Sequence, residues 1–240
     1  MEWPDGFGRI TLDTIDSTNK EASRLASDIT QPTWILAEEQ TSGVGRRGRK
    51  WSSQKGNFSS TLLMPISGDL SSVALHSFVA SLALRDTFLH ITNEPNKFNL
   101  KWPNDVLLEN KKISGILIES EMQQENLELT IGIGINYSIP KKESWWGDLG
   151  NLRDILPREQ LINTILKKII AFKEHSYSDW QQAWENRCMH QNLEINIQTN
   201  SDAQIAGIFR GVDNEGKMLL ETINGTQAIS SGECSITGLY

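Results

Sequence analysis

Residues 41–51 read Thr-Ser-Gly-Val-Gly-Arg-Arg-Gly-Arg-Lys-Trp, and they follow a strand-like run at residues 34–37. Glycines alternate here with a cluster of positive charges. Glycine lets the backbone approach a ligand closely and turn its N–H groups toward it, and the planar arginine head group matches phosphate geometry. The segment therefore predicts a flexible loop that closes over a phosphate-bearing ligand. A solvated basic surface loop is the simpler alternative.

The same glycines, Gly43, Gly45 and Gly48, match the G-x-G-x-x-G pattern of dinucleotide-binding folds. That pattern requires a helix that begins within it, so that the helix N-terminus meets the pyrophosphate. Residues 51–60 read Trp-Ser-Ser-Gln-Lys-Gly-Asn-Phe-Ser-Ser and contain no helix start. The context excludes a dinucleotide-binding fold, and the chain has no P-loop motif.

Patterning on either side of the loop predicts an α+β domain. Strands are expected at residues 9–15, 34–37, 58–64, 97–102, 113–119 and 127–135. Thr18 and Glu21 have capping-box spacing at the start of a helix to about Ser27, and a second helix is expected at 71–90. A third begins near Pro157, with an apolar stripe of Leu161, Ile162, Ile165, Ile169 and Ile170.

The sequence pattern changes near residue 188. Short strand-like runs at 195–198, 203–209, 217–222 and 226–230 alternate with turn signals such as Asn224-Gly. We therefore expect a larger domain at residues 1–188 and a small all-β domain at 189–240.

Composition limits the classes of protein that fit. The 240 residues carry a net charge of −7, which argues against broad attraction to DNA or membranes. The two cysteines have no CxxC spacing, so no disulfide framework or zinc site is expected. The N-terminus lacks the pattern of a signal peptide, and no apolar run is long enough to span a bilayer. A cytoplasmic location is predicted.

Three further segments combine chemical groups in short spans. Residues 101–105 read Lys-Trp-Pro-Asn-Asp, and a hairpin from there would bring Asp105 near Lys112. A lysine and a carboxylate so placed suit a nucleotide triphosphate site. Residues 131–136 alternate isoleucine with glycine and end on Asn136, a pattern of tight packing or of a ligand close to the strand. Residues 16–19, Asp-Ser-Thr-Asn, could begin a helix or bind a polar heterocycle.

These segments occur in the order found in biotin–protein ligases, which the chain resembles from about residue 10 to its end. The resemblance implies a class II synthetase-like catalytic domain, with a mixed β-sheet flanked by helices, and a small C-terminal β-barrel. Biotin contacts are implied for Ser17, Thr18, Asn19, Gln40, Val44, Gly45, Arg46, Lys112 and Gly115. ATP contacts are implied for Arg46, Arg49, Trp51, Asn104, Lys112 and Asn136, and catalytic roles for Arg46, Asp105 and Lys112. Val44 departs from the family, in which that position is usually basic.

The resemblance also implies a reaction. The enzyme would use ATP with Mg²⁺ to make biotinyl-5′-AMP, then transfer biotin to a lysine of a biotin carboxyl carrier domain of a carboxylase. About fifteen residues precede Ser17, so a ligase without the DNA-binding domain of repressor-type relatives is expected, acting as a monomer or homodimer, with no DNA or membrane partner. The alternatives are a related lipoate–protein ligase and a noncatalytic nucleotide-binding protein.

Overall fold

The structure is a computed structural model that describes residues 3–66, 73–94, 96–123, 126–139, 146–150, 158–173, 177–199 and 203–236. Its larger sheet has seven strands in the spatial order β1 (Gly8–Ile15), β2 (Thr33–Gln40), β3 (Phe58–Ile66), β7 (Asn126–Ile135), β6 (Lys111–Gln123), β5 (Asp105–Leu108) and β4 (Phe98–Lys101). Strands β1 and β2 are parallel and the other neighbours are antiparallel. The predicted mixed sheet is confirmed, and β5 is the arm of the expected hairpin that carries Asp105.

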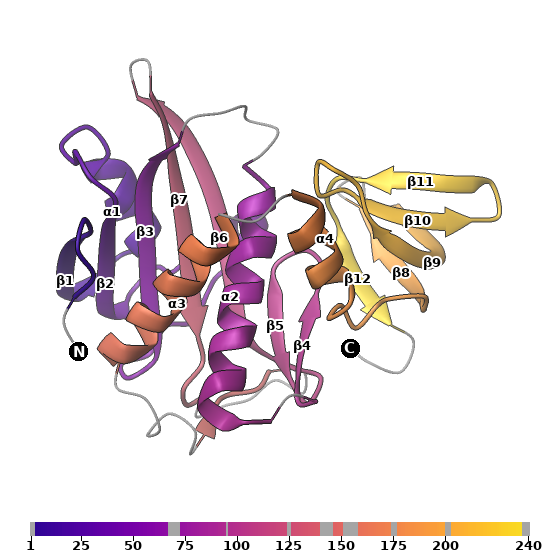
Figure 1. Ribbon diagram of the computed structural model, residues 1–240, viewed down its shortest axis with the longest axis horizontal. Helices are drawn as coiled ribbons and strands as arrows, with labels where there is room; N and C mark the ends of the chain where they lie inside the picture. Colours follow the sequence, from indigo (N-terminus) through magenta and orange to yellow (C-terminus); the bar gives the residue numbers. More distant parts are fainter. Residues whose placement is uncertain are drawn as a thin grey trace.

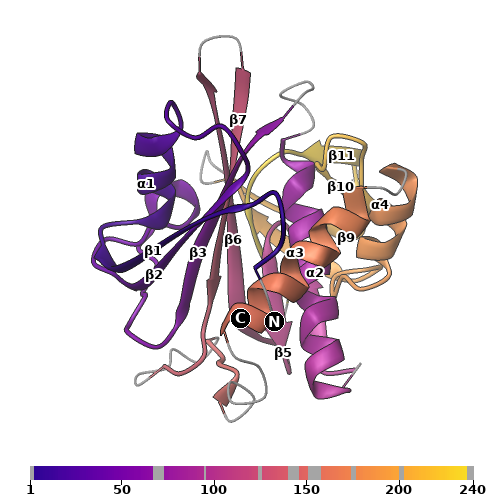
Figure 2. The same ribbon diagram turned by 60° about the vertical axis from the view of Figure 1, so that its left-hand side comes forward.

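Helices cover both faces of this sheet (Figures 1 and 2). On one face lies α1 (Thr18–Leu25), and on the other lie α2 (Leu75–Thr92) and α3 (Arg158–Lys173). The alternation of side chains along β2 explains the two layers. Ile35 packs in a small cluster with Ala22 of α1, whereas Trp34 and Leu36 join the main core. The face under α1 therefore has a thin apolar layer, which leaves room for polar groups.

The helices differ from the sequence prediction in several details. Helix α1 is preceded by Ser17 as its N-cap, and that cap forms no side-chain hydrogen bond, so the capping box predicted from Thr18 and Glu21 is wrong. Glu21 instead pairs with Arg24. Helix α2 ends on Asn93, whose left-handed φ of 54° terminates it.

The third helix is present as α3, although Pro157 lies outside the described residues. The expected apolar stripe is buried except at Ile170, which is 39% exposed, so only the inclusion of Ile170 was wrong. Because successive helical residues are about 100° apart, Ile170 follows Ile169 around to the solvent side. The short helix α4 (Tyr177–Glu185) was not predicted.

The C-terminal strands form a separate five-stranded antiparallel sheet beside β4 and β5 (Figure 1). Its order is β11 (Gly225–Ile229), β10 (Met218–Thr222), β9 (Gln204–Val212), β8 (Glu194–Gln198) and β12 (Glu233–Ile236). A barrel requires its first and last strands to pair. Within the described residues β11 pairs with β10 and β12 pairs with β8, so the expected barrel is an open sheet.

None of the described helices is both long and apolar enough to cross a membrane.

Candidate active site

A cavity of about 770 Å³ opens on the α1 face of the large sheet, between the loop at residues 43–51 and the small sheet. Its walls come from parts of the chain that are far apart in sequence, from Ser17 to Ser235. All of the residues for which a site role was predicted line it: Ser17, Thr18, Asn19, Gln40, Val44, Gly45, Arg46, Arg49, Trp51, Asn104, Asp105, Lys112, Gly115 and Asn136. The fold therefore brings the separate sequence motifs to one place.

The basic glycine loop is a compact hairpin in this structure. The N–H of Gly45 donates to the carbonyl of Arg49 at 2.7 Å, and the N–H of Trp51 donates to the carbonyl of Gly43 at 2.9 Å. A side chain at position 43 would place its Cβ 2.6 Å from the Trp51 carbonyl oxygen, and Gly48 has a φ of 70°. These two glycines are thus needed for the fold of the loop itself.

Trp51 packs against glycines of the sheet. A Cβ at Gly134 of β7 would lie 2.5 Å from Cζ2 of the indole, and a Cβ at Gly115 of β6 would lie 3.1 Å from Cζ3. Gly132 similarly makes room for the side chain of Asn19, which a Cβ there would strike. Of the two interpretations of the alternating glycines, the structure shows close packing by the protein's own side chains.

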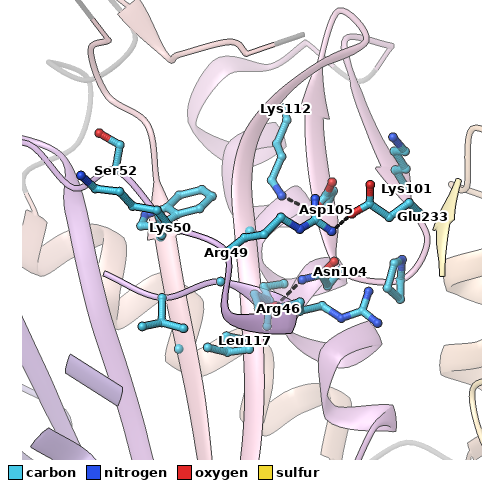
Figure 3. Close-up of a pocket in the computed structure, with 18 of the residues that line it drawn as sticks. Arg46, Arg49, Lys50, Ser52, Lys101, Asn104, Asp105, Lys112, Leu117 and Glu233 are labelled. Carbon is cyan, nitrogen blue, oxygen red and sulfur yellow. Dashed lines mark hydrogen bonds and ion pairs between the residues drawn. The ribbon is translucent and has the colours of Figure 1, made fainter. Parts of the chain in front are cut away.

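One carboxylate is surrounded by cations (Figure 3). Nζ of Lys112 lies 2.6 Å from Oδ1 of Asp105, and both side chains are mostly buried. Lys112 also lies 5.5 Å from the centroid of the Trp51 ring. Lys101 is the cross-strand partner of Asp105 in the β4–β5 hairpin and is 9% exposed. Arg46 of the loop interacts electrostatically with the same carboxylate.

The burial of these cations affects their ionisation. Burial lowers the pKa of Arg46 and of Lys101, and in each case the negative charge of Asp105 acts in the opposite direction. A guanidinium nevertheless stays protonated in a protein. The cavity therefore presents positive charge in a partly dry environment, where electrostatic attraction to an anion is stronger than in water.

The loop is also tied to the small sheet. The guanidinium of Arg49 forms an ion pair with Glu233 of β12 (Figure 3). Both side chains are substantially exposed, so the pair contributes little to stability, although it joins the loop to β12.

The opposite end of the cavity is polar and uncharged. The backbone N–H and the hydroxyl of Thr18 donate to Oε1 of Gln40, at 2.8 and 3.0 Å. The amide nitrogen of Gln40 in turn donates to the hydroxyl of Ser53 at 2.7 Å. Ser17 is 2% exposed. These groups form a buried array of donors and acceptors.

Asn19 extends that array toward the rim. Its amide nitrogen donates to Oε2 of Glu119 at 2.7 Å, and its amide oxygen lies 2.7 Å from the hydroxyl of Thr61. The orientation of the amide group is thereby fixed.

The two remaining asparagines bond to backbone carbonyls. The side-chain amide of Asn104 donates to Ile116 at 2.5 Å, and that of Asn136 donates to Gly147 at 3.1 Å. Both bonds hold neighbouring segments of the cavity wall together.

The donor set indicates how magnesium would fit. The described residues contain no group of three or more His, Cys, Asp or Glu side chains able to hold a metal ion. Asp105 is engaged by Lys112. Mg²⁺ is commonly held by one or two carboxylates together with substrate phosphates. The site therefore fits an ion that arrives on a nucleotide, not a resident one.

Comparison with known proteins identifies the family. Residues 11–136, more than half of the chain, match the model of the Biotin/lipoate A/B protein ligase family. The chain belongs to this family. Residues 192–236 match the Biotin protein ligase C terminal domain, so both sheets of this ligase have family counterparts.

Relatives of the ligase narrow the assignment. It is 32% identical to the Paracoccus denitrificans biotin–[acetyl-CoA-carboxylase] ligase, over 93% of this chain and 98% of that protein. It is 28% identical to the bifunctional ligase/repressor BirA of Escherichia coli, covering 97% of this chain and 75% of BirA. A biotin protein ligase from Aquifex aeolicus, solved with biotin and ATP, superposes with a TM-score of 0.76 at 29% identity, over 95% of this chain and 97% of that one. These matches place the chain with the biotin protein ligases of the family.

Sequence reasoning missed several groups in the ligase cavity. Lys101 was noted only as the cation of its motif, and its cross-strand position opposite Asp105 depends on the tightness of the β4–β5 turn. Glu233 was noted only as part of the C-terminal resemblance. The roles of Thr61 and Glu119, which bond to Asn19 without lining the cavity, were also missed, because only the packing of α1 on the sheet brings them to Asn19.

Proposed function

We propose that this ligase activates biotin with ATP as biotinyl-5′-AMP and transfers biotin to one lysine of a biotin carboxyl carrier domain. One observation carries the proposal: the cavity joins a buried, uncharged array of polar groups to a cluster of cations around a carboxylate. The first suits the ureido ring of biotin, and the second suits the reacting carboxylate and phosphates.

The first step brings two anions together. An oxygen of the biotin carboxylate attacks the α-phosphorus of ATP, the mixed anhydride forms, and pyrophosphate leaves. Arg46, Lys101 and Lys112 are the cations placed to offset the repulsion, and the charge that develops on phosphate oxygens is stabilised most where water is excluded. Magnesium bound to the nucleotide would supply further charge neutralisation.

The second step requires a neutral amine. The acceptor lysine attacks the carbonyl carbon of the anhydride, an amide bond forms, and AMP leaves with the electron pair of the broken C–O bond. A free lysine titrates near pH 10.4, so it reaches the site as an ammonium. Asp105 is placed to orient that ammonium and accept a proton from it. The loop at residues 43–51 would shield the anhydride from hydrolysis.

The domain boundary and the role of each domain are also proposals. Residues 1–188 would form the biotin- and ATP-binding domain, and residues 189–240 the small domain, which adds Glu233 to the cavity. The family match at 192–236 supports this boundary. We further propose a cytoplasmic enzyme, monomeric or homodimeric, that does not bind DNA.

The deciding experiment is ATP–pyrophosphate exchange in the presence of biotin or of lipoate. We expect exchange with biotin only. Exchange that depends on lipoate would instead support a lipoate–protein ligase, and binding of ATP without any exchange would support a noncatalytic nucleotide-binding protein. Thermal shift with the same ligands gives an independent measure, since a ligand at a hundred times its dissociation constant adds about 2.7 kcal/mol of stability.

A further inference from the structure

Asp105, Gly115 and Gly134 form a row across the sheet with Lys101. Lys101 of β4 faces Asp105 of β5, Asp105 faces Gly115 of β6, and Gly115 faces Gly134 of β7. Directly paired residues of antiparallel strands point to the same face, with Cβ atoms about 5 Å apart. Because the two glycines have no side chains, they leave space on this face of the sheet for other side chains beside the carboxylate of Asp105.

The side chain of Lys112 occupies the space over Gly115. A Cβ at Gly115 would lie 3.3 Å from both Cε and Nζ of Lys112, which shows that the lysine crosses directly over the glycine to reach Asp105. Its Nζ is 2.6 Å from Oδ1 of Asp105, and that oxygen is closed to solvent. Each of these two groups therefore blocks the other.

This pairing conflicts with the roles proposed for the two residues. Lys112 is needed on the anionic substrates, and Asp105 is needed on the ammonium of the acceptor lysine. A carboxylate already bonded to Lys112 has little attraction left for a second ammonium. The conflict disappears if the two contacts form in sequence.

We propose that the Lys112–Asp105 pair is an interlock: an anion must draw Lys112 away before Asp105 can receive the acceptor lysine, while Lys101 remains as the counter-charge of Asp105. Lys101 suits that part because it is fixed opposite Asp105 by strand pairing and is almost fully buried. Breaking a buried ion pair is costly when one charge is left alone, and Lys101 prevents that outcome. The interlock rests on the proposed function, and it makes adenylate formation a condition for productive binding of the carrier.

A first test uses inorganic pyrophosphate and needs neither biotin nor carrier. Asp105→Asn should release Lys112 and tighten pyrophosphate binding about tenfold, measured by calorimetry. In the Lys112→Met background the same substitution should give no gain. A gain of equal size in both backgrounds would mean that Asp105 merely repels the anion, and it would overturn the interlock.

Lys101 is tested in the same cycle. Lys101→Met should weaken pyrophosphate binding, because Asp105 loses the counter-charge on β4 and holds Lys112 more strongly, and Lys101→Arg should restore it. In the Asp105→Asn background the loss should vanish. A loss that persists there would show that Lys101 contacts the anion directly and has no role through Asp105.

The second test measures how much the acceptor lysine contributes to carrier binding. A biotin carboxyl carrier domain is compared with the same domain carrying methionine at its acceptor position, with and without a sulfamide analogue of biotinyl-adenylate. For the wild-type ligase the lysine should add about tenfold in affinity only with the analogue. For the Lys112→Met ligase the acceptor lysine should add this affinity even without the analogue. For the Asp105→Asn ligase it should add none, with or without the analogue.

The outcomes separate the two proposals. If the analogue fails to raise the thermal stability of the wild-type protein, the proposed function is wrong, and the pyrophosphate cycle still decides the interlock. If the analogue binds but the lysine contributes equally with and without it, the interlock is wrong and the proposed function stands.

Discussion

The side chain of Lys112 lies 2.6 Å from Asp105 and 5.5 Å from the centroid of the Trp51 ring. Lys112→Ala should lower biotin-dependent pyrophosphate exchange about 10²–10³-fold, because a preorganised group that stabilises transition-state charge is removed. The neighbouring Lys111 is exposed and does not line the cavity, so Lys111→Ala is the matched control and should retain activity. Near wild-type exchange by a folded Lys112→Ala protein would contradict the assignment.

Gly134 is the position where a single methyl group should displace Trp51. A Cβ there would lie 2.5 Å from the indole, and overpacking of this kind costs about 1–3 kcal/mol. Gly134→Ala should lower the urea midpoint and weaken ATP binding. If the indole is the cause, Trp51→Ala in the Gly134→Ala background should recover stability. If Gly134→Ala lowers stability as much in the Trp51→Ala protein as in the wild type, the cost arises elsewhere in β7.

At the scale of the element, the loop at residues 43–51 must open to admit substrates and close to protect the anhydride. Arg46→Gly should favour open forms and release biotinyl-adenylate, which would then acylate lysines of unrelated proteins. Ordering the loop costs backbone entropy of about 1–2 kcal/mol per residue, and an added glycine increases that cost.

Incubation with albumin, biotin and ATP, followed by streptavidin blotting, measures this release. Arg47→Gly is the control, because Arg47 does not line the cavity and has a φ of 60° that glycine adopts readily. If Arg46→Gly forms adenylate but labels albumin no more than wild type does, the loop does not retain the intermediate.

The elements with strong local signals could be predicted from the sequence. The six expected strands of the large sheet are present because alternation and turn residues define them locally. Helix α4 and strand β12 were missed. Helix α4 is short, and its buried Trp180 and Trp184 take their places from packing against Phe78 of α2. Strand β12 is a short polar run that pairs with the distant β8.

The open edge of the small sheet also could not be predicted. Closure depends on whether the first and last strands meet, which is a property of strand tilt and twist and not of any local pattern. Every residue for which a site role was expected lines the cavity, whereas the parts played by Lys101 and Glu233 were missed. The internal contacts of the cavity, such as the position of Trp51 over Gly134, depend on side-chain packing that motif spacing does not encode.

At the scale of the whole molecule, His190 lies between α4 and β8, where the chain enters the small sheet. It is fully buried, its ring stands 5.7 Å from that of Phe209, and neither ring nitrogen has a hydrogen-bond partner among the described residues. Burial, together with the charge of Lys101, lowers the pKa of His190 from 6.5 to about 3. Between about pH 3 and pH 6.5, His190 is therefore neutral in the folded protein but protonated in the unfolded chain.

This difference predicts that the ligase loses stability as the pH falls below 6.5 toward 3. The loss from His190 is up to about 1.4 kcal/mol per pH unit, because the unfolded state binds the extra proton. Urea unfolding of wild type and His190→Leu at pH 7, 6 and 5 measures it, and the variant should show the shallower slope. His90→Leu, at an exposed position, should leave the slope as in wild type. Equal slopes for His190→Leu and wild type would contradict the prediction.

The bond from Asn19 to Glu119 joins residues that are 100 positions apart, and the ion pair from Arg49 to Glu233 joins the loop to the last strand. During synthesis on the ribosome the chain is made from the N-terminus, so Ser17 to Trp51 emerge long before their partners. Non-local pairing of this kind is slow to form. A nascent chain thus carries Asn19 and Arg49 well before the residues that contact them in the completed protein. The polar array and the loop at residues 43–51 gain these contacts only after β6 and then β12 have been made.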